Sequence, residues 1–244
     1  MNESRKLLTL TDLKAGYGEI NVLWGIDLTL RQGEITALVG SNGAGKSTLM
    51  RTLSGLIAPT GGRIEWDGQD LRGLAPAQFV AHGIAHVPEG RRLFSAMNVE
   101  DNLLMGAYAR NEPRRTIRRD LERVYATFPK LYDRRNQAAG TMSGGEQQMC
   151  AIGRGLMSAP RLLMIDELSL GLSPLLVEQL VDALKVLNRE GLSILVVEQD
   201  VVTAFELSQT AFVMDMGRIV QHGASADLMN DPSIRRAYLG ALAA

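Results

Sequence analysis

One stretch of the chain has the residue types and the spacing that bind phosphate. It runs from Gly40 to Ser47 with the sequence GSNGAGKS and matches the pattern G-x-x-x-x-G-K-[S/T]. Glycines let successive backbone N–H groups turn inward around phosphate oxygens, and the start of a helix adds partial positive charge. We expect Lys46 to reach the β- and γ-phosphates of a nucleotide and the Ser47 hydroxyl to bind Mg²⁺. The complete match disfavours the alternative, an ordinary glycine turn before a helix. The residues predicted to bind ATP in this segment are Gly40, Ser41, Asn42, Gly43, Ala44, Gly45, Lys46, Ser47 and Thr48.

Two adjacent carboxylates follow a short apolar run further along the chain. Leu162–Ile165 (LLMI) is typical of a buried strand, and Asp166 and Glu167 come directly after it. Open α/β sheets bind ligands at the carboxyl ends of their strands. We therefore expect Asp166 to orient Mg²⁺, directly or through water, and Glu167 to act as the general base for the attacking water. Without the phosphate loop, an acidic turn after a core strand would explain the pair equally well.

A second glycine site lies far downstream of the first. Ser143, Gly144 and Gly145 stand at the start of a predicted helix that continues to Ser158. A serine hydroxyl and free backbone N–H groups at a helix N-terminus form another anion site. A head-to-tail dimer would use both sites, with each ATP held between Lys46 of one chain and Ser143 of the other.

The elements that must position these residues follow an α/β pattern. Strands are predicted at Ile35–Val39, Leu162–Ile165 and Ile194–Val197, because short, continuously apolar runs indicate strands buried on both faces. Helical periodicity follows each of them, which favours a parallel sheet covered by helices. The predicted helices are Lys46–Leu56, Pro174–Arg189 and Val201–Ser208.

The remaining parts of the chain have different patterns. Residues 7–66 contain stretches that alternate apolar and polar positions, and Asp67 and Gly68 form a hairpin-turn pair, so an antiparallel β layer is expected there. Residues 91–159 are rich in arginine and helix formers and are predicted to form an inserted helical subdomain. We predict one domain over residues 1–244, with 1–90 and 160–244 forming the P-loop NTPase core and its β layer.

The composition excludes several classes of protein. Twenty-six basic residues balance 27 acidic ones, which argues against a dedicated nucleic-acid-binding protein. The lone cysteine, Cys150, cannot form an internal disulfide, and we expect it to pack as a small apolar residue. We find neither a secretory signal nor a run of about 18 apolar residues that could span a bilayer. Any membrane process would therefore need other chains to supply the spans.

The segment Met142–Gln147 (MSGGEQ) resembles the LSGGQ signature of ABC-transporter ATPases, and the likeness covers essentially the whole chain. It implies an ABC ATPase that hydrolyses ATP with Mg²⁺ as a dimer, with a RecA-like α/β core. The signature residues that contact the partner's ATP would be Ser143, Gly144, Gly145 and Glu146.

The same resemblance assigns roles outside the glycine sites. Tyr17 resembles the aromatic residue that stacks on adenine, although a core or turn tyrosine is the alternative. Glu89 falls in the Q-loop, where it would contact ATP and the metal. Gln199 takes the place of the switch residue. The loop that crosses the dimer interface, the D-loop, would contain Ser169, Gly171 and Leu172.

Within that family the chain resembles the LivF-type ATPase of branched-chain amino acid importers. The segments that carry this likeness are Val87–Phe94, Gly140–Met149, Ala151–Arg154, Val196–Gln199 and Arg236–Gly240. The resemblance implies a role in uptake of leucine, isoleucine and valine from the cytoplasmic face of the cell membrane. The implied partners are a second ATPase subunit, two transmembrane permeases and, indirectly, a periplasmic solute-binding protein. Importers of urea, other amides or other amino acids share much of the pattern and stay as alternatives.

Three positions depart from the ABC pattern. Glu89 replaces glutamine and adds negative charge near the phosphates, and Leu168 replaces a proline that would fix φ. Gln199 replaces the switch histidine, and its amide cannot carry an imidazolium charge. Because hydrogen bonds to charged groups contribute about 1.5–3 kcal/mol, roughly twice the neutral value, we expect a weaker switch contact. LivF-type relatives share the glutamine, so an inactive site is not implied.

Two further interpretations concern arginines and rival functions. Arg91 and Arg92 are expected to contact the membrane subunit. For the arginines at 110, 114, 115, 118, 119 and 123, a solvated helix face is favoured over the alternative, contact with the membrane subunit or with anionic lipid. A small-molecule kinase would need an acceptor pocket and no Ser143 signature. A non-transport ABC ATPase would carry coiled coils or a second cassette, and this chain has neither.

Overall fold

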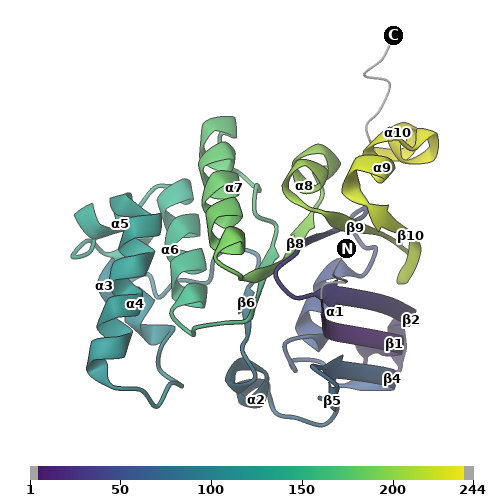
Figure 1. Cartoon of the computed structure of the whole chain (residues 1–244), viewed down its shortest axis with the longest axis horizontal. Coiled ribbons are helices and arrows are strands. Elements are labelled where there is room, and N and C mark those ends of the chain that lie inside the picture. Colours follow the sequence, from purple (N-terminus) through teal and green to yellow (C-terminus); the bar gives the residue numbers. More distant parts are fainter. Residues whose placement is uncertain (1–4, 239–244) are drawn as a thin grey trace.

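A computed structural model describes residues 5–238 and contains two β-sheets and a group of helices that stands to one side of them (Figure 1). Part of the Arg236–Gly240 segment, Leu239 and Gly240, lies outside the described residues. No helix within the described range is long and apolar enough to cross a membrane.

The six-stranded sheet has the strand order β10-β9-β3-β8-β7-β6, in which β10 is antiparallel to β9 and the other neighbours are parallel. Every residue of β3, β7 and β8 is buried, which confirms the prediction of strands covered on both faces. The parallel arrangement brings the ends of these strands to one edge, where the predicted phosphate loop and carboxylates begin. The strands are β3 (Ile35–Val39), β6 (Ile84–Val87), β7 (Leu162–Asp166), β8 (Ser193–Glu198), β9 (Thr210–Asp215) and β10 (Arg218–Ala224).

The smaller sheet is antiparallel, with the order β2-β1-β4-β5. Asp67 and Gly68 join β4 to β5 with φ values of 52° and 84°, the left-handed conformations that a two-residue hairpin turn requires. The expected antiparallel layer is therefore confirmed. Its strands are β1 (Lys6–Tyr17), β2 (Ile20–Arg31), β4 (Pro59–Trp66) and β5 (Gln69–Asp70).

Two apolar cores lie on opposite faces of the six-stranded sheet. Along β7, Leu163 and Ile165 pack on the face toward the helical group, whereas Leu162 and Met164 pack toward the antiparallel sheet. This separation follows from the alternation of side chains along a strand. The sheet thus packs against both outer layers, and this packing on two faces fixes the positions of its strand ends.

Helices surround the larger sheet, and their ends differ slightly from the sequence prediction. The predicted helix Pro174–Arg189 is observed with the same bounds. The helix after the phosphate loop ends at Thr52, before the predicted Leu56, because the chain turns at Gly55 with φ of 70° and Leu56 N–H bonds back to the Arg51 carbonyl. The helices on the core are α1 (Lys46–Thr52), α2 (Pro76–Ala81), α7 (Pro174–Arg189), α8 (Val201–Leu207), α9 (Ser225–Asn230) and α10 (Pro232–Tyr238).

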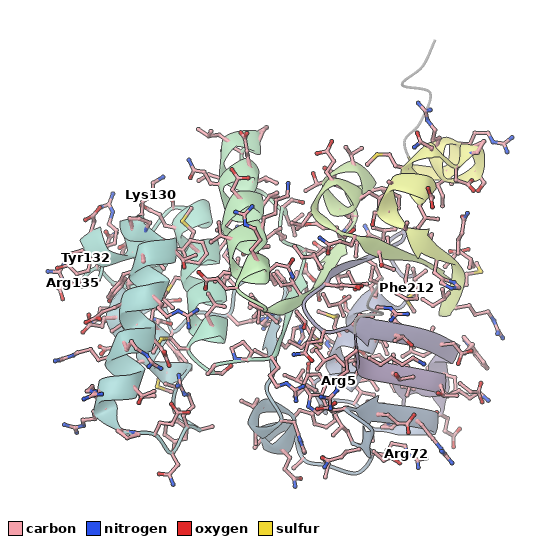
Figure 2. All side chains as sticks on the ribbon, in the orientation of Figure 1. Arg5, Arg72, Lys130, Tyr132, Arg135 and Phe212 are labelled. Atoms are coloured by element: carbon pink, nitrogen blue, oxygen red, sulfur yellow. The ribbon has the colours of Figure 1, made fainter. Side chains whose placement is uncertain are left out.

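The residues between β6 and β7 form the separate helical group (Figure 1). Their side chains project to its outer edge, where Arg135 lies over the ring of Tyr132 at 4.2 Å (Figure 2). This arrangement supports the predicted subdomain at residues 91–159, whose limits stay a prediction. Its elements are α3 (Val99–Met105), α4 (Arg114–Thr127), α5 (Pro129–Asp133), the short 3₁₀ helix η1 (Ala139–Thr141) and α6 (Gly144–Leu156).

Candidate nucleotide site

The phosphate loop connects the end of β3 to the start of α1. Gly43 and Gly45 have φ values of 82° and 106°, which only glycine adopts without strain. A β-carbon at Gly40 would lie 2.2 Å from the carbonyl oxygen of Met214, so this position also needs glycine. Ser41 and Asn42 are exposed at the mouth of the loop, whereas Ala44 and Thr48 are buried beneath it.

Lys46 lies inside this loop with only 6% of its surface exposed. Its Nζ donates hydrogen bonds to the carbonyl oxygens of Gly40 at 2.7 Å and Ser41 at 3.0 Å. Burial lowers the pKa of the ammonium group, and the charges of Glu167, Asp166 and Glu198 oppose that effect. The cation is thus held over the concave side of the loop, where it can exchange carbonyl partners for phosphate oxygens.

Asp166 ends β7 beside this loop and is 5% exposed. Burial, followed by the charges of Glu167 and Glu89, raises its pKa to about 6, while Lys46 and a hydrogen bond from Ser47 act in the opposite direction. The structure therefore brings together the hydroxyl and carboxylates predicted to bind Mg²⁺. Such oxygen ligands and their excess negative charge suit a hard divalent cation.

The metal would still need ligands from outside the protein. Among the described residues, no three His, Cys, Asp or Glu side chains form a group that could hold a metal ion. Mg²⁺ usually keeps several waters and binds substrate phosphates beside one or two carboxylates. The donors present here fit that mode of binding.

Glu167 and Gln199 form a direct contact at the carboxyl edge of the sheet. The Nε2 of Gln199 donates a hydrogen bond to Oε1 of Glu167. Glu167 has a left-handed φ of 55°, a strained conformation that its N–H stabilises by donating to the Val197 carbonyl at 2.9 Å. Leu168, which replaces proline, is fully buried and fixes this turn by packing in the core.

Glu198 is an additional buried acid that the sequence analysis did not assign to a role. It ends β8, is 2% exposed and accepts hydrogen bonds from the backbone N–H and the hydroxyl of Ser169. The rest of this predicted D-loop lies at the surface, with Gly171 exposed at φ of 68° and Leu172 partly buried. The available signal was an acid that directly follows the apolar run Ile194–Val197.

The signature residues form the N-terminus of α6. Ser143 is exposed, and its hydroxyl and backbone N–H donate to the carboxylate of Glu146 at 2.8 Å and 2.9 Å. This is a capping box. Burial opposes ionisation of Glu146, but the hydrogen bonds from Ser143 and the charges of Arg134 and Lys130 lower its pKa overall.

The two glycines of the signature are closely packed. A β-carbon at Gly145 would lie 2.5 Å from Leu176, and at Gly144 it would lie 3.3 Å from the Arg91 guanidinium. The start of α6 and the phosphate loop are well separated within one chain (Figure 1). The two predicted anion sites therefore do not meet within a single chain.

Tyr17 and Glu89 are the remaining residues predicted to contact ATP. Tyr17, at the end of β1, is 46% exposed, and its hydroxyl accepts a hydrogen bond of 2.9 Å from Arg51 on α1. This exposure disfavours a core tyrosine. Glu89 is exposed and is followed by Gly90, Arg91 and Arg92 in left-handed conformations. The contact between Tyr17 and Arg51 had no signal in the sequence.

The arginines of the helical group divide into two kinds. Arg114, Arg115, Arg118 and Arg119 are exposed, as predicted for a solvated face. Arg110 is different, and the prediction is wrong for it, because its side chain is 9% exposed, with ion pairs to Asp120 at 2.6 Å and Glu112 at 2.5 Å. It also donates to the Met157 carbonyl at 2.8 Å, so it joins α4 to the end of α6.

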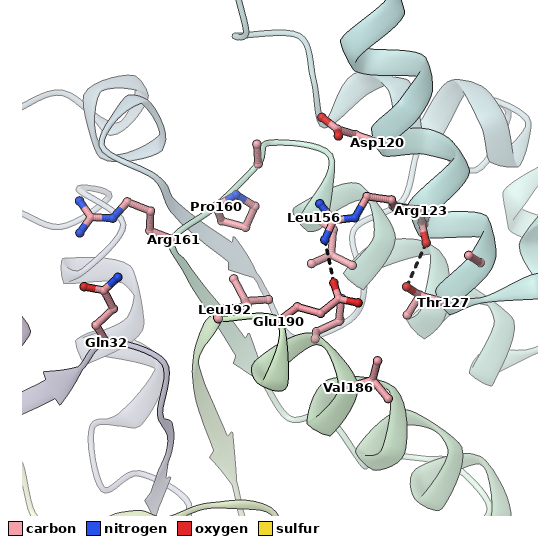
Figure 3. Close-up of a pocket in the computed structure, with 15 residues that line it drawn as sticks. Gln32, Asp120, Arg123, Thr127, Leu156, Pro160, Arg161, Val186, Glu190 and Leu192 are labelled. Carbon is pink, nitrogen blue, oxygen red and sulfur yellow. Dashed lines mark hydrogen bonds and ion pairs between the residues drawn. The ribbon is translucent and has the colours of Figure 1, made fainter. Parts of the chain in front are cut away.

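A pocket of about 520 Å³ lies away from the nucleotide site, at the amino ends of β7 and β8. It is bounded by α4, the segment before β7 and the end of α7, and an ion pair of 2.7 Å between Arg123 and Glu190 crosses it (Figure 3). None of the residues predicted to bind ATP lines it. The pocket therefore lies apart from the candidate nucleotide site at the carboxyl edge of the sheet.

The fold and this site define an ATP-binding cassette. Residues 23–169 match the model of the family described as ABC transporter, and the chain belongs to that family. It is an ATPase of the ABC type and resembles the LivF-type subunits.

Two relatives and one solved structure illustrate the likeness. The chain is 44% identical to the high-affinity branched-chain amino acid transport ATP-binding protein BraG of Pseudomonas aeruginosa, over 96% of this chain and 100% of the relative. It is 33% identical to the probable branched-chain amino acid transport ATP-binding protein LivF of Archaeoglobus fulgidus, over 96% and 99%. A solved ATP-binding subunit of an ABC transporter is 30% identical, with a TM-score of 0.82 over 96% of each chain.

Proposed function

We propose that this chain is the ATP-hydrolysing subunit of an importer for branched-chain amino acids. The observation that carries the proposal is its 44% identity to BraG over 96% of this chain and 100% of that relative. We propose that it acts at the cytoplasmic face of the cell membrane with a second ATPase subunit and two transmembrane permeases. A periplasmic solute-binding protein would deliver the amino acid to them.

In the proposed reaction, water attacks the γ-phosphorus of ATP, the bond to the β–γ bridging oxygen breaks, and Glu167 accepts the proton from water. Lys46 and the loop N–H groups stabilise the phosphates, and Gln199 orients Glu167. Mg²⁺ would neutralise phosphate charge, held by Ser47, Asp166 and, at the Q-loop, Glu89.

Each ATP would lie between two chains. Ser143 is exposed at the first turn of α6, where its hydroxyl donates to Glu146, and the same chain's phosphate loop does not reach this turn. In the dimer, the partner's Ser143 hydroxyl would exchange Glu146 for a phosphate oxygen of the ATP. The partner's Gly144, Gly145 and Glu146 would complete this contact. Closing the dimer would move the predicted D-loop and the attached permeases together.

A phosphate-release assay without any acceptor tests the reaction. We expect Mg²⁺-dependent ADP formation, loss of turnover by about 10²–10⁴-fold in Glu167→Gln, and retained ATP binding in that variant. Phosphate transferred only to an added small molecule would instead indicate a kinase. Uptake of labelled leucine, isoleucine, valine and urea by cells with and without the gene tests the solute. Loss of urea uptake alone would refute the branched-chain assignment.

A further inference from the structure

The buried carboxylate of Glu198 connects the predicted D-loop to Gln199 and Glu167. Glu198 Oε1 accepts the Ser169 N–H at 2.7 Å, and Oε2 accepts the Ser169 hydroxyl at 2.9 Å. The same Oε2 accepts the backbone N–H of Gln199 at 3.3 Å. Gln199 then donates to Glu167 through its side chain. These contacts form one continuous path from Ser169 to Glu167.

The position of Glu198 is unusual for an acid. It lies in the central part of the sheet, where β8 pairs with β3 on one side and with β7 on the other. Side-chain alternation places it on the same face as Val196, which packs in the core toward α7 and α8. A buried acid costs free energy unless it is well hydrogen-bonded, and an apolar residue would fill a strand end at lower cost. Holding its three N–H and O–H donors in a fixed arrangement is a role that an apolar residue could not perform.

We propose that Glu198 is a positioning residue for ATP hydrolysis, which ties Ser169 to the backbone of Gln199 and thereby fixes the amide that orients Glu167. The inference rests on the proposed assignment of Ser169 to the D-loop. A contact between the partner chain and the predicted D-loop then affects the position of Glu167 through Glu198. ATP binding does not depend on this path, because Lys46 and the phosphate loop hold the nucleotide.

Glu198→Gln separates the two halves of the path with little change in volume. The amide oxygen can still accept the Ser169 N–H, and the Ser169 hydroxyl can rotate to accept from the amide NH₂. The NH₂ group cannot accept the Gln199 N–H, so this connection alone is lost. We expect kcat to fall about 10- to 100-fold, the scale of a small misplacement of catalytic groups. The KM for ATP and the affinity for a fluorescent ATP analogue should stay within about twofold of wild type, since no loop contact changes.

Three further variants test for a general loss of structure. Asp200→Asn removes a neighbouring carboxylate that caps α8 by accepting from Val202 N–H at 3.1 Å, and its kcat should stay within about twofold of wild type because asparagine also caps well. Ser169→Ala should lower kcat, because it lacks the hydroxyl that bonds to Glu198. Ser169→Thr keeps a hydroxyl and should retain the wild-type kcat. The effects of Ser169→Ala and Glu198→Gln should be non-additive in the double variant, as for residues of one network.

The outcomes separate this inference from the proposed function. Wild type that forms no ADP would overturn the proposed function itself. If wild type is active, a kcat of Glu198→Gln within about twofold of the wild-type value would overturn the role of Glu198. The proposed function would not be affected by that result. Parallel loss of ATP affinity and kcat would also overturn it, since that pattern indicates a structural residue. Should Glu198→Gln fail to fold, the Ser169→Ala and Ser169→Thr pair decides, and equal kcat values for the two refute the proposal.

Discussion

The ring of Tyr17 offers the sharpest test of where the base of ATP binds. The ring is half-exposed at the end of β1, and its hydroxyl is fixed by Arg51 at 2.9 Å. Stacking of an aromatic ring on a base contributes about 1–3 kcal/mol. Tyr17→Ala should therefore weaken ATP binding about 5- to 150-fold, the range that corresponds to that energy. The bound phosphates should be unaffected, so kcat at saturating ATP should change little.

The hydroxyl of Tyr17 and the guanidinium of Arg51 can be tested separately. Their hydrogen bond is already present in the nucleotide-free chain and contributes about 0.5–1.5 kcal/mol. Tyr17→Phe should therefore weaken ATP binding by no more than about 2- to 10-fold, through looser positioning of the ring. Arg51→Ala should weaken ATP binding as much as Tyr17→Phe does. The double variant should bind ATP no more weakly than either single variant, because both substitutions remove the same bond.

The assay is equilibrium titration with a fluorescent ATP analogue, with inorganic triphosphate as a competitor that lacks a base. Tyr17→Ala should leave the competitor's affinity unchanged. Wild-type ATP affinity in Tyr17→Ala would refute adenine stacking at this residue. Equal weakening of ATP and triphosphate would refute it as well, since the change would then lie in the phosphate loop.

Three further predictions concern packing and charge. Arg110→Ala should lower the free energy of unfolding by about 1–3 kcal/mol in urea titrations, because it removes the hydrogen bonds that a largely enclosed guanidinium donates to Asp120 and to the Met157 carbonyl. A change as small as that of Arg115→Ala, which is exposed, would contradict this. Gly145→Ala should destabilise the chain by about 1–3 kcal/mol, because the added methyl group crowds Leu176. Gly144→Ala meets only the flexible guanidinium of Arg91 and should keep the wild-type melting temperature, so equal melting temperatures for the two variants would refute the packing argument. The pKa of Asp166 is raised to about 6 by burial and by neighbouring acids, so ionising it costs the folded, nucleotide-free chain free energy. Asp166→Asn should raise the melting temperature at pH 8, and the gain should shrink as pH falls through 6 toward 4; a gain independent of pH would contradict the raised pKa.

Much of the site could be predicted because its parts are local in sequence. The phosphate loop needs glycine at Gly43 and Gly45 for φ alone, and its lysine follows directly. The strand before Asp166 is apolar at every position, so its burial and the placement of its acids follow from a pattern of a few residues. The bounds of α7, from Pro174 to Arg189, follow from Pro at the start and continuous periodicity. The end of α1 was missed because a turn at Gly55 competes with helical periodicity.

The sequence by itself predicted a phosphate loop, two acids at a strand end and a second glycine site at the start of a helix. Only the tertiary structure decided that Glu198 holds Ser169, that Arg51 holds Tyr17, and that Arg110 is buried while its neighbours are solvated. The physical reason is distance along the chain. Glycine conformations, strand burial and helix caps depend on near neighbours, so they can be inferred from short patterns. Contacts between residues tens of positions apart depend on how sheets and helices pack, and no short pattern records that packing.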